Sequence, residues 1–350
     1  MPKSESIKKL LNRTLYRINS LGNHKLKIMI SEAELNKYRA LGDKEADEII
    51  NQIVDQNGIA SLRQIMSFLS DYQNLSFENQ SPILQSFLST NASLPVFYDK
   101  KKLIRSTDFY RENQQNIALI LGLYSLPYCY LGADGAKVLY MSERIKNDTY
   151  RRLTETGNFL KAVMNYDNWK GERIFSICLK VRLLHATIRY FTLQSKQWDL
   201  AWGYPINQED MLGTNLAFSL VVLRGMEKFG YSVDKTYEDA YINTWNVIGF
   251  LLGVNQEIMP ENYLEAVKID KQIAERQFRQ SVEGQELTTS LMQVVRSFAP
   301  SEITANLLQS QSRMLLGEKY AKMLGIAETN FPNALLKIYN TTSVLMSKIF

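Results

Sequence analysis

The sequence is poor in the residues that build most metal and redox sites. Its 350 residues include two cysteines and two histidines. Cys129 and Cys178 lie far apart and outside any C-x-x-C pair, which excludes a zinc ribbon, a thioredoxin-type site and covalent attachment of a c-type haem. Common non-haem metal sites need two or three imidazoles or a cysteine cluster, and the chain has neither. So few cysteines also fit a reducing compartment, and we expect a cytoplasmic protein.

Proline and glycine are also scarce, at 8 and 17 residues. This scarcity favours long helices over many-turned β architectures. The most apolar stretch, 117–131, contains Ser125 and Pro127 and is too short to span a bilayer comfortably, so it predicts a buried helix broken near Pro127 and no transmembrane segment. Residues 1–19 show no apolar signal core, and we therefore expect no secretory signal.

Charge of one sign is not concentrated anywhere in the chain. The formal net charge of +5 is spread out, and no block of five like charges occurs. This pattern predicts no nucleic-acid partner. The sequence also lacks a P-loop and the G-x-G-x-x-G, G-x-S-x-G and H-E-x-x-H motifs, while two distant histidines argue against a conventional catalytic triad.

Helical periodicity dominates what is present, and it predicts an all-α fold. An N-terminal helical region, 1–107, is expected to precede a helical domain, 108–350, with 91–107 as a boundary loop that includes Pro95 and the run 100–102. Expected helices cover 4–19, 31–38, 44–55, 61–69, 82–89, 108–131, 134–147, 149–164, 172–196, 208–229, 236–253, 261–283, 286–297, 301–323 and 331–348.

His185 is the first candidate for chemistry, because His24 lies in a polar loop where a solvated side chain is expected. On a helix, His185 shares its face with apolar residues such as Val181 and Ile188. Burial there keeps an imidazole neutral, which is the form that binds iron. Spacing alone favours an ordinary core histidine paired with a carbonyl or hydroxyl. Arg182 and Arg189, one turn away on either side, favour a haem site instead, since they could pair with haem propionates.

A second candidate group is Arg152, Glu155 and Thr156. Arg152 and Thr156 share a helix face that continues through Phe159 and Val163, so a cation and a hydroxyl enter an apolar stripe. This pattern indicates a polar patch that opens into a pocket. The alternative is an ordinary helix in which Thr156 bonds back to the preceding turn and Arg152 stays at the rim.

The segment 202–210 contains a helix start. Asn207 as N-cap with Asp210 three residues later is close to a capping box, and acids in the first turn suit the helix dipole. We interpret Asn207 and Asp210 as structural residues that begin a helix, and no catalytic role is needed to explain them.

Taken together, three segments resemble the haem b family of latex clearing proteins (rubber oxygenases) and the related mycophenolic-acid oxygenase. The resemblance runs from about 108 to 262 and is clearest in 180–189, in 205–210, and in 245–254 with Pro260. It implies a globin-like helical core around haem b with His185 as proximal iron ligand. It also implies that Arg152 and Thr156 match the family's Arg-x-x-Lys-Thr helix near the haem, where Glu155 replaces the lysine. Glu155 is then either a distal base or a carboxylate at the rim.

The resemblance therefore implies an O2-dependent haem oxygenase that acts on an apolar, olefinic small molecule, with an electron donor if one is needed. Rubber outside the cell is not the expected substrate, because no secretory signal is present. Two alternatives stay open at this point: a non-catalytic haem sensor or storage protein, and a helical scaffold that uses no haem.

Overall fold

The computed structural model describes residues 30–71, 74–141, 149–171 and 173–328. These residues form helices and no β-strand, apart from one isolated bridge between Gly132 and Phe278. The all-α prediction is confirmed. None of the described helices is long and apolar enough to cross a membrane. The helices predicted at 4–19 and 331–348 lie outside the described residues.

Four short helices form the N-terminal part of the described chain, and each lies where periodicity predicts it. Ser31 begins the first with a capping box, in which its hydroxyl and the Glu34 carboxylate accept each other's backbone N–H. The four helices are α2 (Glu32–Arg39), α3 (Lys44–Asn57), α4 (Ser61–Ser70) and α5 (Pro82–Asn91).

The next helices differ from prediction at one place. The loop predicted at 91–107 is wrong for its second half, because α6 begins at Lys100. Asp99 caps this helix by accepting backbone N–H bonds from Lys101 and Lys102, and the buried side chain of Leu103 follows. The elements are α6 (Lys100–Ile120), the π-helix η1 (Leu121–Ser125), α7 (Leu126–Tyr130), α8 (Ala133–Met141), α10 (Thr149–Val163), α11 (Tyr166–Lys170) and α12 (Arg173–Gln194). The break expected near Pro127 takes the form of η1.

The C-terminal half contains three breaks that periodicity did not predict. The segment 208–229 divides at Ser219, whose hydroxyl donates to the Asn215 carbonyl, and 301–323 divides at Gly317, which has a φ of 81°. The helix predicted at 261–283 ends at Gln277, and the next helix begins at Val282, where Ser281 provides the cap. The elements are the 3₁₀ turn η2 (Leu200–Trp202), α13 (Gln208–Phe218), α14 (Leu220–Lys228), α15 (Lys235–Leu251), η3 (Gln256–Ile258), α16 (Tyr263–Gln277), α17 (Val282–Ser297), α18 (Glu302–Leu316) and α19 (Glu318–Met323).

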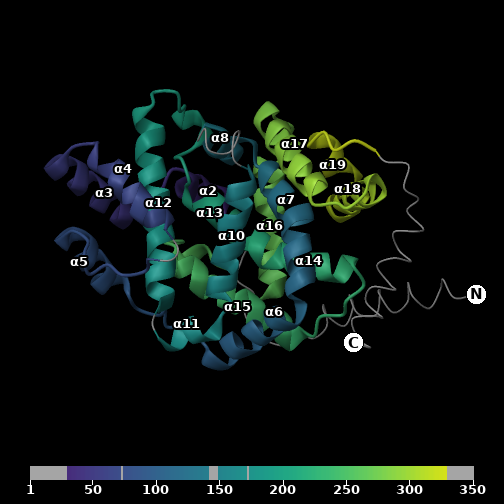
Figure 1. Cartoon of the computed structure of the whole chain (residues 1–350), viewed down its shortest axis with the longest axis horizontal. Helices are drawn as coiled ribbons and strands as arrows, with labels where there is room; N and C mark the ends of the chain where they lie inside the picture. Colours follow the sequence, from purple (N-terminus) through teal and green to yellow (C-terminus); the bar gives the residue numbers. More distant parts are fainter. Residues whose placement is uncertain (1–29, 72–73, 142–148, 172, 329–350) are drawn as a thin grey trace, which may run out of the picture.

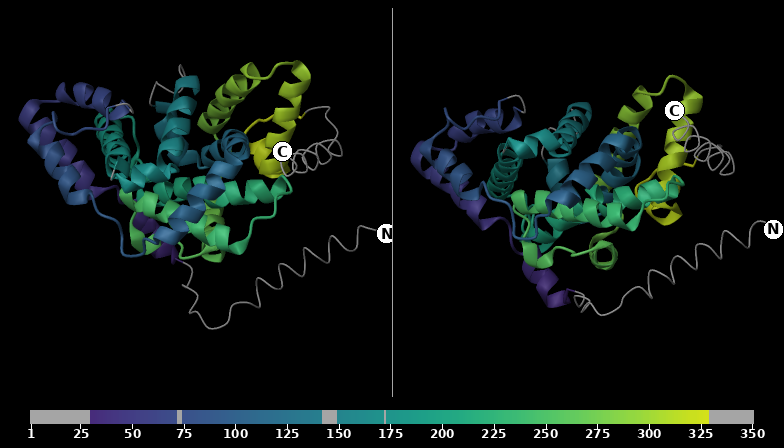
Figure 2. Two further views of the ribbon diagram at one scale, coloured as in Figure 1. Left: turned by 60° about the horizontal axis from the view of Figure 1, so that its bottom comes forward. Right: turned by 90° about the horizontal axis from the view of Figure 1, so that it is seen from below.

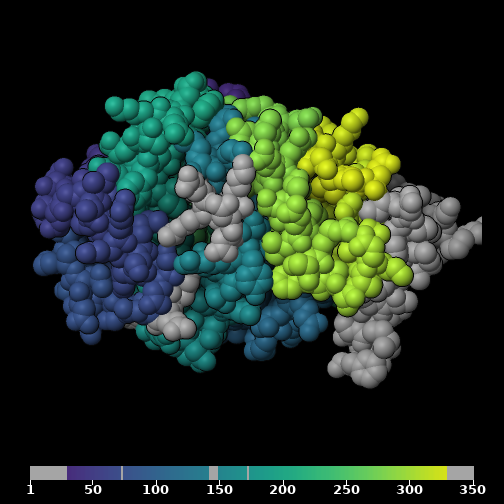
Figure 3. Space-filling view, turned by 45° about the horizontal axis from the view of Figure 1, so that its top comes forward, coloured from purple at the N-terminus to yellow at the C-terminus, as the bar shows by residue number. Residues whose placement is uncertain are grey.

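Helix α12 joins the N-terminal helices to the rest of the molecule. It packs against α3, α4 and α5 along one side and also contacts α10, α11 and α15 (Figure 1). The two further views keep α3–α5 together at one end, with α17–α19 at the other (Figure 2), while α2 packs against α13. The space-filling view shows the same order, with α10 and α12 between the two ends (Figure 3). The boundary predicted between residues 107 and 108 falls inside α6, and whether the two regions fold separately stays a prediction.

Candidate functional site

Helix α12 presents His185 on a face that is incompletely packed. Val181, Leu184, His185 and Ile188 lie at helical spacings that place them on one face, and all four keep part of their surface accessible. The neighbouring Leu183 and Ala186 are at most 1% exposed. His185 thus lies deep in the protein, yet within an apolar stripe that retains free surface.

The surroundings of His185 keep its imidazole neutral. Burial, together with the positive charges of Arg189 and Arg152, lowers its pKa from 6.5 to about 4. Its Nδ1 atom is buried and has no hydrogen-bond partner in the part of the chain that the structure describes. A core histidine paired with a carbonyl or hydroxyl through Nδ1 is therefore not what the structure shows. A neutral imidazole with an unpaired nitrogen can serve as a metal ligand.

Helix α10 supplies the second predicted group and packs against α12. The positive charge of Arg152 is one of the causes that lower the pKa of His185, after burial and Arg189. Arg152 also counteracts burial in setting the pKa values of Cys129 and Tyr130 on α7. The cation of Arg152 thus faces the interior between α7, α10 and α12.

The other two residues of this group differ in their placement. Glu155 accepts a bond of 3.0 Å from Nε of Arg151, and its side chain is 31% exposed, so the structure favours the rim position. Thr156 is partly accessible, and the hydroxyl that bonds back to the preceding turn is that of Thr154, which donates to the Tyr150 carbonyl.

Arg182, predicted to pair with a propionate, instead binds carboxylates of the N-terminal helices. Its Nε and Nη2 donate to both carboxylate oxygens of Asp43 at 2.5 and 2.9 Å. Nη2 also reaches Glu45, and Nη1 donates to Asn91. Because all three guanidinium nitrogens have partners, Arg182 fixes α12 against α3 and α5.

Arg189 is only partly satisfied. Its Nε donates to Asp47 at 2.6 Å, and Nη1 makes a long contact of 3.4 Å with the Ile206 carbonyl. Nη2 is buried and has no partner among the described residues. The guanidinium is 1% exposed, so this N–H is available only to a buried acceptor.

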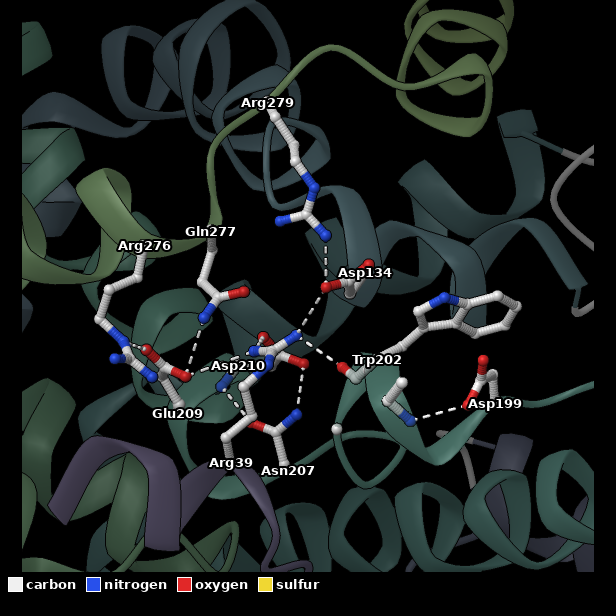
Figure 4. A network of polar contacts seen from close by, with 12 residues as sticks. Arg39, Asp134, Asp199, Trp202, Asn207, Glu209, Asp210, Arg276, Gln277 and Arg279 are labelled. Carbon is white, nitrogen blue, oxygen red and sulfur yellow. Dashed lines mark hydrogen bonds and ion pairs between the residues drawn. The ribbon is translucent and has the colours of Figure 1, made fainter. Parts of the chain in front are cut away.

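The turn at 205–210 carries an ion network that sequence reasoning missed. Asn207 caps α13 as predicted, accepting the Asp210 N–H at 2.9 Å. Glu209, fully buried, binds Arg39, Arg276 and Gln277 from α2 and α16 (Figure 4). The capping pattern revealed the helix start, but nothing local distinguishes a buried acid in a first turn from an exposed one.

The network continues on the far side of Arg39. Arg39 also binds Asp210 and the carbonyl of Trp202, and a longer ion pair of 3.4 Å joins it to Asp134 on α8. Arg279 makes a second ion pair with Asp134 (Figure 4). These contacts connect α2, α8 and α13, and they pair the carboxylates of Asp134 and Asp210 with arginine side chains.

The donor set around His185 limits which cofactor it could hold. No group of three or more His, Cys, Asp or Glu side chains able to bind a metal ion occurs within the described ranges. A metal at His185 would therefore take most of its ligands from elsewhere, as iron does in a porphyrin ring. The single imidazole, its unpaired nitrogen and the accessible apolar stripe fit a haem.

Comparisons with known proteins place the chain in a family. The family model "ER-bound oxygenase mpaB/B'/Rubber oxygenase, catalytic domain" matches residues 129–343. A rubber oxygenase of Streptomyces sp. (strain K30) is 24% identical over 291 residues, which cover 82% of this chain and 71% of the relative. A solved structure of latex clearing protein in the closed state aligns with a TM-score of 0.74 at 22% identity, covering 89% of this chain and 84% of the other.

The matched region includes every predicted site residue, from Arg152 on α10 to Arg189 on α12. The family match covers more than half of the chain and so decides between the catalytic and non-catalytic alternatives. The chain belongs to the mpaB and rubber oxygenase family and is an oxygenase.

Proposed function

We propose that this oxygenase uses haem b held by His185 and acts with O2 on an apolar, olefinic small molecule. The observation that carries the proposal is the buried, unpaired Nδ1 of a neutral His185 on an accessible apolar stripe. The name of the Streptomyces relative, a rubber oxygenase, supports an apolar olefinic substrate class. Haem, when bound, supplies the oxygen chemistry that no side chain can perform.

The chain's own residues bind and orient the reactants. His185 would hold the iron of a bound haem through a neutral ring nitrogen, and Val181, Leu184 and Ile188 on the same face would provide an apolar surface for it and exclude water. Arg189, whose Nη2 has no partner among the described residues, would donate a hydrogen bond to a propionate. Arg182 acts one step away, holding α12 in place through Asp43.

Arg152 and Thr156 on α10 orient the oxygen-containing reactant from the opposite helix. The guanidinium supplies positive charge to the interior between α7, α10 and α12, and the Thr156 hydroxyl supplies a hydrogen bond. Glu155, paired with Arg151, holds or accepts a proton at the rim. An electron donor, if one is needed, is a separate molecule, and a cytoplasmic location stays a prediction from the cysteine content.

The test is an absorption spectrum of protein purified from cells given a haem precursor. We expect a Soret band in the wild type that is lost in His185→Ala while the far-ultraviolet circular dichroism stays the same. His24→Ala, which changes the other histidine of the sequence, is the matched control and should keep the band. A colourless, folded wild type would refute the haem proposal.

If the Soret band is present, O2 consumption with candidate olefins tests the reaction. Thr156→Val keeps the shape of the side chain and removes the hydroxyl, and we expect it to lower the rate by roughly tenfold or more at an unchanged Soret band. An unchanged rate would remove Thr156 from the mechanism.

A further inference from the structure

The connection between α5 and α6, which Figure 1 shows at the edge of the molecule, contains exposed apolar side chains. Val96 is 104% exposed, which means that its side chain is as accessible as in an extended peptide. Leu94 and Ile104 are each 38% exposed. We refer to residues 94–105 as the Val96 tip. Leu94 and Val96 are two residues apart in the chain, and neighbouring exposed apolar side chains can mark a contact surface.

Cations surround these apolar side chains. Lys100, Lys101 and Arg105 are exposed, and Lys102 is partly exposed. The one acid within the tip, Asp99, caps α6 through the backbone N–H groups of Lys101 and Lys102.

Acids near the tip offset only part of this charge. Asp108, just beyond the tip, is paired with Arg111 at 2.8 Å. Hydrogen bonds from Thr236 and the charge of Arg105 lower the pKa of Asp234, so this carboxylate is ionised and offsets part of the charge of Arg105, while the lysines at 100–102 remain. The tip therefore carries a positive excess.

Contacts of the residues next to Val96 with the rest of the protein hold the tip in place and keep Val96 exposed. The Phe97 carbonyl accepts a bond of 3.1 Å from Nδ2 of Asn243, and the rings of Phe97 and Phe250 meet edge to face at 6.3 Å. Tyr98 stacks on Trp169 at 6.3 Å. With these neighbours packed inward, Val96 is directed away from the protein.

We propose that the Val96 tip binds the surface of an anionic phospholipid bilayer. Lysine and arginine side chains are attracted to anionic headgroups, and exposed apolar side chains are stabilised when they are buried at the boundary between the headgroups and the acyl chains. A nucleic acid would satisfy the cations and leave Val96 and Leu94 in water, so the observations favour a lipid surface. Binding itself does not depend on haem; only the further idea that the membrane supplies an apolar substrate rests on the proposed function.

The experiment is flotation of the full chain with vesicles of phosphatidylcholine alone or with roughly a third phosphatidylserine. We expect at least about tenfold stronger partitioning to the anionic vesicles at low salt, weakened by added salt. Lys100→Gln with Lys101→Gln should weaken binding to anionic vesicles roughly tenfold. Val96→Ser should weaken it about fivefold or more.

Matched controls change exposed residues far from the tip. Ile303→Ser removes a side chain that is 72% exposed on α18, and Lys319→Gln removes an exposed lysine on α19, at the other end of the molecule (Figure 1). Both should bind like the wild type. The proposal is overturned if the wild type does not float with anionic vesicles, if the Ile303 and Val96 variants behave alike, or if single-stranded RNA of matched charge competes fully at equal phosphate. Because flotation needs no Soret band, the haem proposal can fail without affecting this result.

Discussion

At the scale of single residues, the ionisation of His185 has a consequence for stability. Its pKa of about 4 in the folded protein lies below the ordinary value of 6.5, so above pH 6.5 the ring is neutral in both the folded and the unfolded state and does not change the free energy of unfolding. Between pH 6.5 and 4 the ring is protonated in the unfolded chain but stays neutral in the folded protein. We expect the free energy of unfolding of the apoprotein to fall by about 3 kcal/mol from this residue across that range.

Urea denaturation of the apoprotein at pH 7 and pH 4 measures this loss. His185→Leu should lack the component, because leucine does not titrate, whereas carboxylates affect wild type and variant alike and cancel in the difference. His24→Leu serves as control and should behave like the wild type. Equal losses in wild type and His185→Leu would mean that His185 is not buried as a neutral ring.

Gly253 is constrained in a different way. It has a φ of 88°, and a Cβ added to it would come within 2.1 Å of Oδ2 of Asp43 and 2.8 Å of Nε of Arg182. Gly317 has a similar φ of 81° but open space around it. Gly317→Ala should therefore cost only the backbone term, about 1 kcal/mol, and Gly253→Ala at least about 1 kcal/mol more. Urea denaturation of both variants checks this. Equal losses in the free energy of unfolding would show that the ion pair of Arg182 and Asp43 can shift to make room for the added Cβ.

At the scale of elements, the buried acid of α13 connects helices that are distant in sequence. Glu209 binds Arg39 of α2 and Arg276 of α16, and its side chain is 0% exposed. Glu209→Gln keeps the shape but removes the buried charge that pairs with two partly buried cations, each of which keeps another acid partner, and we expect a loss of about 2 kcal/mol in the free energy of unfolding. Glu48→Gln, in an exposed pair with Lys44, should cost at most about 0.5 kcal/mol. A small, equal effect of both changes in chemical denaturation would contradict a stabilising role for this network.

The helices were predictable because their signals are local. Apolar spacing and caps such as Ser31 and Asn207 lie within one or two turns of the residues they order. The start of α6 was missed because a basic run resembles a loop, although Leu103 buries its side chain within that first turn. Partners were not predictable: Arg182 was expected to bind a propionate, and its acid Asp43 lies 139 residues away. Only the fold brings such pairs together.

At the scale of the whole molecule, the N-terminal helices complete the environment of α12. Arg182 binds Asp43, Arg189 binds Asp47, and Nζ of Lys180 donates to the Asp71 carbonyl at 2.5 Å. All three cations are buried, at 8% exposure or less. The helix that carries His185 thus depends on partners from the first hundred residues.

Removing those partners tests whether the N-terminal region is a separate unit. A fragment of residues 99–350 keeps the Asp99 cap of α6 but leaves Lys180, Arg182 and Arg189 without their partners. The deletion also removes α3, α4 and α5, which pack against α12, so the apolar side chains buried between these helices become exposed to water. The loss of that burial is comparable to the whole stability of an ordinary domain. We expect the fragment to lack near-ultraviolet circular dichroism and cooperative thermal unfolding. Adding residues 1–98 as a separate peptide should restore both, because the same carboxylates then return; a fragment that unfolds cooperatively by itself would instead show that the region from α6 onward folds without them.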